Sequence, residues 1–517
     1  MDSSTSVELF AVGIYLVLLL WIGFRSAGQI TSSLDYTLAG RGVPWMVVMA
    51  TTAATMVGGG ASVGRVAAVY ELGIAAALVT VAWHLQLIFT GYFCAPRLRG
   101  LNLITVGDYF ELKYGELGRI LAVINCIIFL VPALAAQMVA MSKVTESIMQ
   151  GIIDYRTALI IGATVTILYS TFGGMRAVIK TDVLQFVILV GGIGAAAAIL
   201  MVRNGGFEGM ARHVDLQESA NIFSHQQPLV LLSVFIAFML GETLVPPYTT
   251  RCFVAKDARH AKIGVAGAGL FLLLFLPSAT FVLGVSAKAD SNVQQQLAAH
   301  TERLVNAGED PEKARAKVQE LVVPELIRST FRPIHPILAG ILIAALIAAA
   351  MSSGDSCLAS LSAIVMEDIY KRHIEPEAED RRLLRVAQGA TLVTGTAAAV
   401  CALAMPNISD LLVFVYDFWT PAMIVPFMVG LFWYHESRII AAVLSMVLGM
   451  ISTAVWRFGV FPRLDPSSPW RIQAAMFGLM VALVTFFVLL PLTKSMTRGR
   501  MFQPRDPRAK EDRKGDS

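Results

Sequence analysis

Hydroxyl side chains recur through one long apolar stretch, which reads AAAMSSGDSCLASLSAIVMEDIY from Ala348 to Tyr370. Ser352, Ser356 and Ser360 follow one another at intervals of four residues, so they would share one face of a helix. Ser353 lies directly beside the first of them. Polar groups at membrane depth are costly and normally face a cavity, a partner helix or an ion path. The stretch therefore indicates a protein that handles an ion inside a lipid bilayer.

Parts of this stretch also have structural explanations, which stay open. Serines in membrane helices let neighbouring helices approach closely or hydrogen-bond to carbonyls of their own helix, and Ser356 and Ser360 fit that role. The one carboxylate among the serines, Asp355, either lies on the ion path or anchors a neighbouring helix.

Three more ionisable residues, Glu242, Arg65 and Asp417, fall inside other apolar segments. A charge at such depth normally has a partner, and a Glu242–Arg65 pair would fasten two segments together. The functional alternative is that Glu242 faces a solute cavity, where it binds an amine, a hydroxyl or a proton. Gln137 and Tyr416 are candidates to line the same cavity.

The composition is that of a helical membrane protein. The chain has 517 residues, of which 56% are hydrophobic and 15% charged, and its mean hydropathy is +0.65. Soluble domains rarely combine these values. The five cysteines have no CxxC spacing, so neither a zinc site nor a disulfide framework is predicted. Without an HExxH motif or a cluster of His or Cys ligands the chain does not read as an enzyme, and we expect no nucleic-acid partner.

Thirteen apolar segments are long enough to span a bilayer. They lie near residues 8–25, 45–68, 74–95, 119–146, 155–171, 175–202, 227–250, 262–286, 335–365, 384–404, 408–433, 437–456 and 471–493. We expect the first to be a retained span, because no basic leader or small-residue cleavage site accompanies it.

The basic residues between these segments predict the topology. Four clusters fall on one side if the count of thirteen holds, and that side is then cytoplasmic, with the N-terminus outside and the C-terminus inside. The clusters are Arg97, Arg99, Lys113 and Arg119; Arg251, Lys256, Arg259 and Lys262; Lys371, Arg372, Arg381, Arg382 and Arg385; and the tail from Lys494 to Lys514. The long insert 287–333 would lie outside, with a short surface helix between Glu309 and Glu325.

Two of the spans contain helix breakers. The second holds Gly58-Gly59-Gly60, and the seventh holds Gly241 followed by Pro246-Pro247. Such breaks survive only where protein or a cavity satisfies the freed backbone groups. They open two sets of five helices at matching places, which points to a transporter with a central binding site.

Three stretches resemble the sodium:solute symporter family, whose members carry proline, pantothenate, sugars or choline. They are LDYTLAGRGVPWMVVMATTAATMVGGGASVGRVAAVYELG (Leu34–Gly73), YSTFGGMRAVIKTDVLQ (Tyr169–Gln185) and the serine-bearing stretch above. The resemblance implies an all-α polytopic membrane protein of about thirteen transmembrane helices. Its core would be a leucine-transporter-like, five-plus-five inverted repeat with one extra N-terminal helix.

Carried over by motif, the family's sodium site falls on two groups of atoms. It takes the backbone carbonyls of Ala53, Met56 and Ala349 and the hydroxyls of Ser352 and Ser353. Unwound carbonyls and neutral hydroxyls suit a cation that must bind and leave.

A carboxylate beside the inner sodium exit would be Asp182, for which a surface pair with nearby Lys180 is the structural alternative. The substrate-binding candidates come from the two broken spans and from two positions on other spans. They are Thr55, Gly59, Gln137, Glu242 and Tyr416, with Arg65 as a possible charge partner.

The solute itself is less constrained. The aromatic positions that would cage choline are Met56 and Pro246 or Pro247 here, so choline is not predicted. Thr55 stands where proline carriers have an acidic residue, while Arg65 would suit a carboxylate and Glu242 an amine.

The sequence thus predicts a sodium-coupled symporter that imports a small polar organic solute, with sodium as the co-transported ion. It would be a multi-pass protein of the cell (inner) membrane. Proton coupling through Glu242 or Asp182 is one alternative, and a membrane sensor that works with a separate partner is another. The expected division is 1–44 (leading helix and loop), 45–202 (first repeat), 203–433 (second repeat), 434–493 (two final helices) and 494–517 (basic tail).

Overall fold

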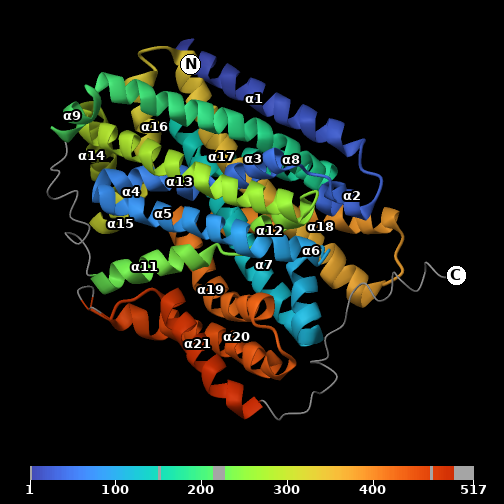
Figure 1. The fold of residues 1–517 in the computed structure, drawn as a ribbon. Helices are drawn as coiled ribbons and strands as arrows, with labels where there is room; N and C mark the ends of the chain where they lie inside the picture. The colour runs from blue at the N-terminus through green and yellow to red at the C-terminus, as the bar shows by residue number, and fades with distance from the viewer. Residues whose placement is uncertain (1–2, 150–152, 213–227, 466–467, 469, 494–517) are drawn as a thin grey trace.

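The computed structural model describes residues 3–149, 153–212, 228–465, 468 and 470–493, and these contain helices and no strands. Among the described residues, nine helices are long and apolar enough to cross a membrane, or eleven if each of two bent helix pairs is one span. Most of the long helices run roughly side by side along one direction (Figure 1). The predicted basic tail lies outside the described residues.

The first half of the chain supplies the leading helix and the first broken helix. Its elements are α1 (Ser3–Ala27), α2 (Ser33–Leu38), η1 (Ala39–Arg41), α3 (Trp45–Met56), η2 (Gly60–Gly64), α4 (Arg65–Leu72), α5 (Ile74–Phe89), η3 (Thr90–Cys94), α6 (Ala95–Gly100), α7 (Val106–Met149), α8 (Tyr155–Arg203) and α9 (Gly206–Ala211).

The second half supplies the second broken helix and the serine-bearing helix α17. Its elements are α11 (Pro228–Gly241), α12 (Pro246–Val254), α13 (Ala258–Ala289), α14 (Ser291–Asn306), α15 (Pro311–Gln319), α16 (Val322–Leu326), η4 (Ile327–Phe331), α17 (Pro336–Ala363), η5 (Ile364–Ile374), α18 (Asp380–Ala404), α19 (Ile408–Phe432), η6 (Glu436–Arg438), α20 (Ile439–Ala454), η7 (Val455–Val460), η8 (Phe461–Arg463) and α21 (Ala474–Thr493).

Both predicted helix breaks are present. The chain bends by 66° between α3 and the segment Gly60–Leu72, and by 41° between α11 and α12. In the second break Leu244 has a left-handed backbone with φ of 60°, which is uncommon for a residue other than glycine. Lipid cannot satisfy unwound backbone, so both breaks must face protein or a cavity.

The predicted spans 155–171 and 175–202 both lie in α8. The helical conformation is interrupted at Gly174, whose φ of 49° and ψ of −159° separate two helices. Glycine is needed there because a Cβ would lie 2.8 Å from the carbonyl oxygen of Tyr36. The predicted span 74–95 corresponds to α5 and η3. The count of thirteen spans stays a prediction. By length and composition, the described residues contain at most eleven candidate spans.

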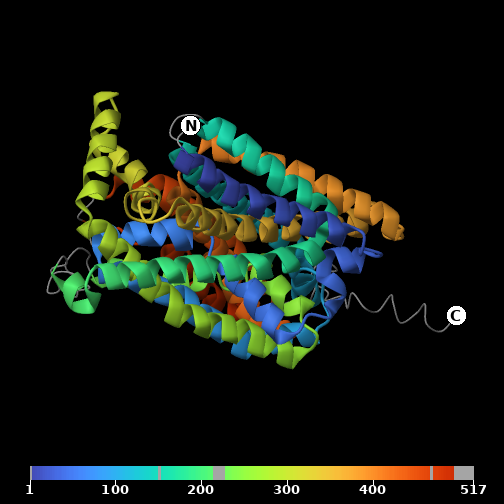
Figure 2. The same cartoon turned by 90° about the horizontal axis from the view of Figure 1, so that it is seen from above.

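Helix α17 lies at the centre of the molecule, against α8, α7 and α1. The last helices, α19, α20 and α21, pack on one another along one flank, while α1 lies on the other flank against α8 (Figures 1 and 2). The insert begins with α14, which projects from one end of the bundle in Figure 2. Only α15 is the expected surface helix, because α16 is buried against the bundle.

A short helix, α2, connects the leading helix to the core outside the spans. Its residue Asp35 accepts hydrogen bonds from Thr31 Oγ1 at 2.7 Å and from Arg176 Nη2 at 2.6 Å. Burial by itself would raise the pKa of Asp35, but these hydrogen bonds from Thr31 and Arg176 lower it below its ordinary value. The contact ties the first loop to the turn that divides α8.

Candidate functional site

Two serines at the middle of α17, both predicted sodium ligands, reach across to two other helices. Ser353 Oγ donates a hydrogen bond to the Thr55 carbonyl at the end of α3, at 2.6 Å. Ser352 Oγ donates to Asp182 Oδ1 on α8, at 2.5 Å. Each hydroxyl oxygen keeps acceptor lone pairs while it donates its hydrogen, so each remains a possible ligand for a cation.

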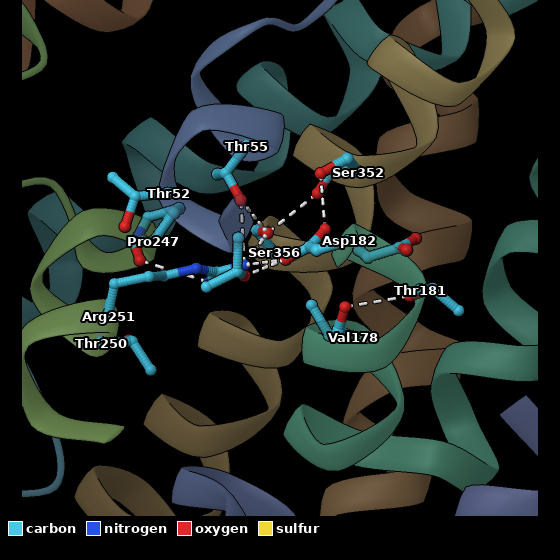
Figure 3. A network of polar contacts seen from close by, with 12 residues as sticks. Thr52, Thr55, Val178, Thr181, Asp182, Pro247, Thr250, Arg251, Ser352 and Ser356 are labelled. Carbon is cyan, nitrogen blue, oxygen red and sulfur yellow. Dashed lines mark hydrogen bonds and ion pairs between the residues drawn. The ribbon is translucent and has the colours of Figure 1, made fainter. Parts of the chain in front are cut away.

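Asp182 is the charged centre of this arrangement (Figure 3). Its side chain is fully buried, and it accepts hydrogen bonds from Ser352, Thr51 and Arg251. The suggested surface pair with Lys180 is wrong, because Lys180 Nζ instead donates to Gln29 Oε1 at 2.6 Å. Asp182 thus faces the interior seam between α3, α8, α12 and α17, which we call the four-helix seam.

Arg251 is the residue that sequence reasoning misplaced. It belongs to one of the basic clusters predicted to be cytoplasmic, yet its side chain is 0% exposed. Its Nη2 lies 2.8 Å from Asp182 Oδ2, 2.9 Å from Thr55 Oγ1 and 2.6 Å from Ser356 Oγ (Figure 3). The apolar run Cys252–Ala255 that follows it, before the next basic residue, was the available signal that the chain is still inside the protein there.

Backbone contacts fix the helix that carries Arg251. Val43, just before α3, donates to the Val254 carbonyl at 3.2 Å and accepts from the Lys256 amide at 2.9 Å. These two hydrogen bonds hold the end of α12 against the beginning of α3. Arg251 lies in the last turn of α12 and is thereby directed into the seam rather than towards solvent.

The remaining polar residues of α17 mostly hold helices together. Ser356 and Ser360 donate to carbonyls of their own helix, at Ser352 and Ser356, each at 2.8 Å. Asp355 accepts a hydrogen bond from Tyr169 of α8. These contacts fit the packing alternative for Ser360 and the anchoring alternative for Asp355, while Ser356 also contacts Arg251.

The predicted carbonyl ligands lie in the same seam. Ala53 and Met56 are buried in the last turn of α3, and Ala349 is fully buried on α17 just before Ser352. The Ala53 carbonyl accepts from the Val57 amide at 3.2 Å, which closes the last helical turn before the break. These carbonyls remain proposed ligands.

A cavity of about 60 Å³ opens beside the seam, between the two broken helices. Thr55, Met56 and Ser353 belong both to the seam and to the cavity wall. The rest of the wall is largely apolar and aromatic. It consists of Gly58, Gly60, Ala61, Trp83, Phe129, Ala133, Gln137, Glu242, Val245, Pro247, Tyr248, Cys357, Leu412 and Tyr416.

Glu242 is the only carboxylate in the cavity wall formed by described residues. Tyr248 donates a hydrogen bond to its Oε2 at 2.8 Å, and Tyr416 donates to its Oε1. The suggested pair with Arg65 is not found: in the described part of the chain, Arg65 makes no ion pair or hydrogen bond. Its guanidinium instead lies over the rings of Trp83, at 5.2 Å, and Phe238, at 5.6 Å.

Gln137 supports the first helix break. Its Oε1 accepts from the Gly59 amide at 2.8 Å, which satisfies a backbone donor freed by the break. Gly59 itself is in contact with α7, because a Cβ there would lie 2.2 Å from Ala140 Cβ. Gln137 therefore forms part of the cavity wall, whereas Gly59, predicted to bind substrate, packs against α7 and is not in that wall.

Asp417 lies apart from both sites. It pairs with Arg457 of η7 and accepts a hydrogen bond from the Ala475 amide of α21 at 2.9 Å. The neighbouring Trp419 donates from Nε1 to the Thr243 carbonyl in the second helix break, at 3.0 Å. Asp417 joins the last helices to α19.

Comparison with known proteins gives one consistent answer. The sequence profile of the sodium:solute symporter family matches residues 36–449. The sodium/glucose cotransporter of Vibrio parahaemolyticus is 26% identical, over 92% of this chain and 89% of its own length. The sodium/proline symporter of Escherichia coli is 26% identical, over 86% of each chain.

Solved structures show the same fold. A sodium-coupled sialic acid symporter, in a substrate-bound outward-open state, superposes with a TM-score of 0.76 at 19% identity and covers 94% of this chain and 97% of its own. The nucleobase-cation-symport transporter Mhp1 superposes with a TM-score of 0.52 at 13% identity, over 92% and 98% of the two chains. The predicted fold class is thereby confirmed, apart from the exact number of helices.

Proposed function

The chain belongs to the sodium:solute symporter family, and from this premise we propose that it couples sodium entry to the import of a small zwitterion. The observation that carries the proposal is Glu242, a carboxylate that faces an aromatic-lined cavity and whose partners among the described residues are only tyrosine hydroxyls. An ammonium group of the solute would supply the missing positive charge. Relatives described as proline symporters carry a solute of this class.

Arg65 supports the zwitterion over a simple amine. Its guanidinium has no carboxylate partner among the described residues and lies over Trp83, whose ring lines the cavity. A guanidinium without an anion is a ready partner for a carboxylate. The proposed solute therefore presents its amine to Glu242 and its carboxylate towards Arg65, with apolar atoms against the aromatic wall.

The proposed sodium ion binds in the four-helix seam. Its ligands are the hydroxyls of Ser352 and Ser353 and the carbonyls of Ala53, Met56 and Ala349, with the carboxylate of Asp182 beside them. Hydroxyl and unwound carbonyl oxygens coordinate sodium in transporters of this type. We place this seam in a plasma membrane with the N-terminus outside and the C-terminus cytoplasmic.

Shared residues give the coupling a physical basis. Met56 and Ser353 belong to the proposed sodium site and also line the solute cavity. Sodium would hold the end of α3 and the middle of α17 in one arrangement, which shapes the cavity before the solute binds. Because coupling between two ligands is reciprocal, the solute must strengthen sodium binding by the same factor.

The first test is the thermal stability of the purified protein in sodium and in potassium, with amino acids, amines, carboxylates and sugars added in turn. A ligand that binds the folded state raises its stability as occupancy rises. We expect zwitterions to stabilise the protein in sodium only. Stabilisation by a solute regardless of sodium, with uptake that follows pH, would replace sodium coupling with proton coupling.

Three variants assign the sites. Ser352→Ala combined with Ser353→Ala should abolish the effect of sodium, whereas Ser360→Ala, on the same helix face, should behave as wild type. Glu242→Gln should weaken zwitterion binding by at least about tenfold, because a charge-assisted hydrogen bond is lost, and should leave sodium binding intact. Unchanged zwitterion affinity in Glu242→Gln would remove Glu242 from the solute site.

A further inference from the structure

The four-helix seam already contains a cation of the protein's own. One guanidinium nitrogen of Arg251 lies within 2.9 Å of oxygens from three helices, at Thr55, Asp182 and Ser356. The side chain is fully buried, and its Nε–H has no acceptor in the described part of the chain. The contacts of Arg251 with these three helices are thus made by the end of its guanidinium. The contacted atoms are hydroxyl and carboxylate oxygens, which are also ligands for metal cations.

The carboxylate of Asp182 is shared between two sides of the seam. Its Oδ2 faces Arg251 at 2.8 Å, and its Oδ1 accepts from Ser352, a proposed sodium ligand, at 2.5 Å. The other described side chains that bond to this pair, namely Thr51, Thr55, Ser352 and Ser356, are neutral. The pair Asp182–Arg251 therefore carries no net charge before sodium arrives.

We propose that Arg251 is a tethered cation that sets the sodium affinity of the seam by neutralising Asp182. With Arg251 in place, the Asp182–Arg251 pair adds no net charge to the site that sodium enters, so sodium binds weakly enough to be released. This inference rests on the proposed sodium site at Ser352 and Ser353. It adds a residue on α12, outside the proposed ligand set, that determines how tightly the ion is held.

The charges predict opposite effects for the two halves of the pair. Removing the charge of Asp182 leaves a fixed positive charge beside sodium and must weaken sodium binding. Removing the charge of Arg251 leaves a net negative charge and must strengthen sodium binding. Charges a few ångströms apart interact strongly in a buried site. Each substitution should therefore change the half-saturating sodium concentration by at least about tenfold. If the pair only tied helices together, both substitutions would weaken binding.

The experiment measures half-saturation of the purified full-length protein with radioactive sodium, so no solute needs to be known. The variants are Arg251→Gln, Asp182→Asn, the double variant with both changes, and Arg251→Lys, which keeps the charge. Arg99→Gln is the matched control. Arg99 also contacts the end of α12, through the Ala255 carbonyl at 2.6 Å, but it makes no hydrogen bond or ion pair with the seam residues.

We expect Arg251→Gln to lower the half-saturating sodium concentration by at least about tenfold and Asp182→Asn to raise it by a similar factor. The double variant should return near the wild-type value, and Arg251→Lys and Arg99→Gln should stay close to it. If Arg251→Gln does not fold, the comparison of Asp182→Asn with the double variant still tests the proposal. In the Asp182→Asn background, the additional change Arg251→Gln must tighten sodium binding.

Weaker or unchanged sodium binding after loss of the Arg251 charge, in either background, would overturn the tethered-cation role. The Ser352→Ala, Ser353→Ala variant separates this failure from failure of the sodium site itself. If that variant loses sodium binding while Arg251→Gln does not tighten it, only the role of Arg251 is wrong. If it binds sodium as wild type does, the proposed site is wrong and the present inference falls with it.

Discussion

Ser352, Ser353 and Ser360 of α17 look equivalent in the sequence but differ in what their hydroxyls contact. Ser360 bonds to a carbonyl of its own helix, which a serine achieves with no partner helix at all. Ser352 and Ser353 instead bond to Asp182 and to the Thr55 carbonyl, on two different elements. Spacing places residues on a helix face, but the neighbouring helices decide which hydroxyls are available to an ion.

Asp417 illustrates a buried charge with a structural role, and it gives a prediction at the same scale. Asp417→Asn should lower the free energy of unfolding by about 1–3 kcal/mol, because Arg457 is left without its counter-charge. The asparagine oxygen can still accept from the Ala475 amide, so the change isolates the ion pair. Thermal unfolding should show this loss with unchanged sodium and solute affinities. Normal stability combined with lost solute affinity would instead place Asp417 in the solute site.

At the scale of elements, the two broken helices do most to create the site. The glycine run after α3 allows three side chains of other helices to approach closely. A Cβ at each glycine would come within 2.6 Å of one of them, with Gly58 facing Ser353, Gly59 facing Ala140 and Gly60 facing Leu412. The glycines thus serve both as a break and as a close-packing surface. The glycine run therefore has a packing role and a functional role at once, because the same close approach that packs the helices also shapes the break.

Gly59→Ala tests that geometry. Its backbone is α-helical, so alanine causes no backbone strain, but the added methyl would lie 2.2 Å from Ala140 Cβ. We expect a loss of sodium-driven uptake and about 1–3 kcal/mol of stability, as overpacked cores show. Adding Ala140→Gly should restore both, because it removes the clashing methyl. Gly13→Ala in α1 should have no effect, because a Cβ added there would meet no packing neighbour within 4 Å. Failure of Ala140→Gly to rescue would show that Gly59 acts through something other than contact with α7.

At the scale of the whole molecule, the cavity must open to one side of the membrane at a time. Cys357 on α17 is the only cysteine in the cavity wall formed by described residues, and it is 5% exposed. The other four cysteines, Cys94, Cys126, Cys252 and Cys401, lie elsewhere. The reactivity of Cys357 therefore reports whether the cavity is open.

With those four cysteines replaced, we expect sodium to accelerate modification of Cys357 by a membrane-impermeant thiol reagent applied from outside. The proposed sodium ion holds the outward-open arrangement, which exposes the cavity wall. A transported zwitterion should then slow the reaction, because it fills the cavity. The rate of labelling in proteoliposomes measures both effects. A rate that neither sodium nor solute changes would contradict alternating access at this cavity.

Residue types and their order along the chain were sufficient for the class of the protein. Apolar length, the two breaks and the serine-bearing helix identified a membrane transporter, because lipid permits polar groups and unwound backbone only where protein satisfies them. Those constraints act locally and can be read one segment at a time.

Charge partners, in contrast, were decided by the tertiary structure. Arg251 and Asp182 are 69 residues apart, and Glu242 meets Tyr416 rather than Arg65. The partner of a buried charge depends on how the helices α3, α8, α12 and α17 pack together. The sequence of a single segment does not specify that packing. The sequence determined that charges lie inside the bilayer, while only the packing of the helices decided that one of them is a tethered cation beside the proposed sodium site.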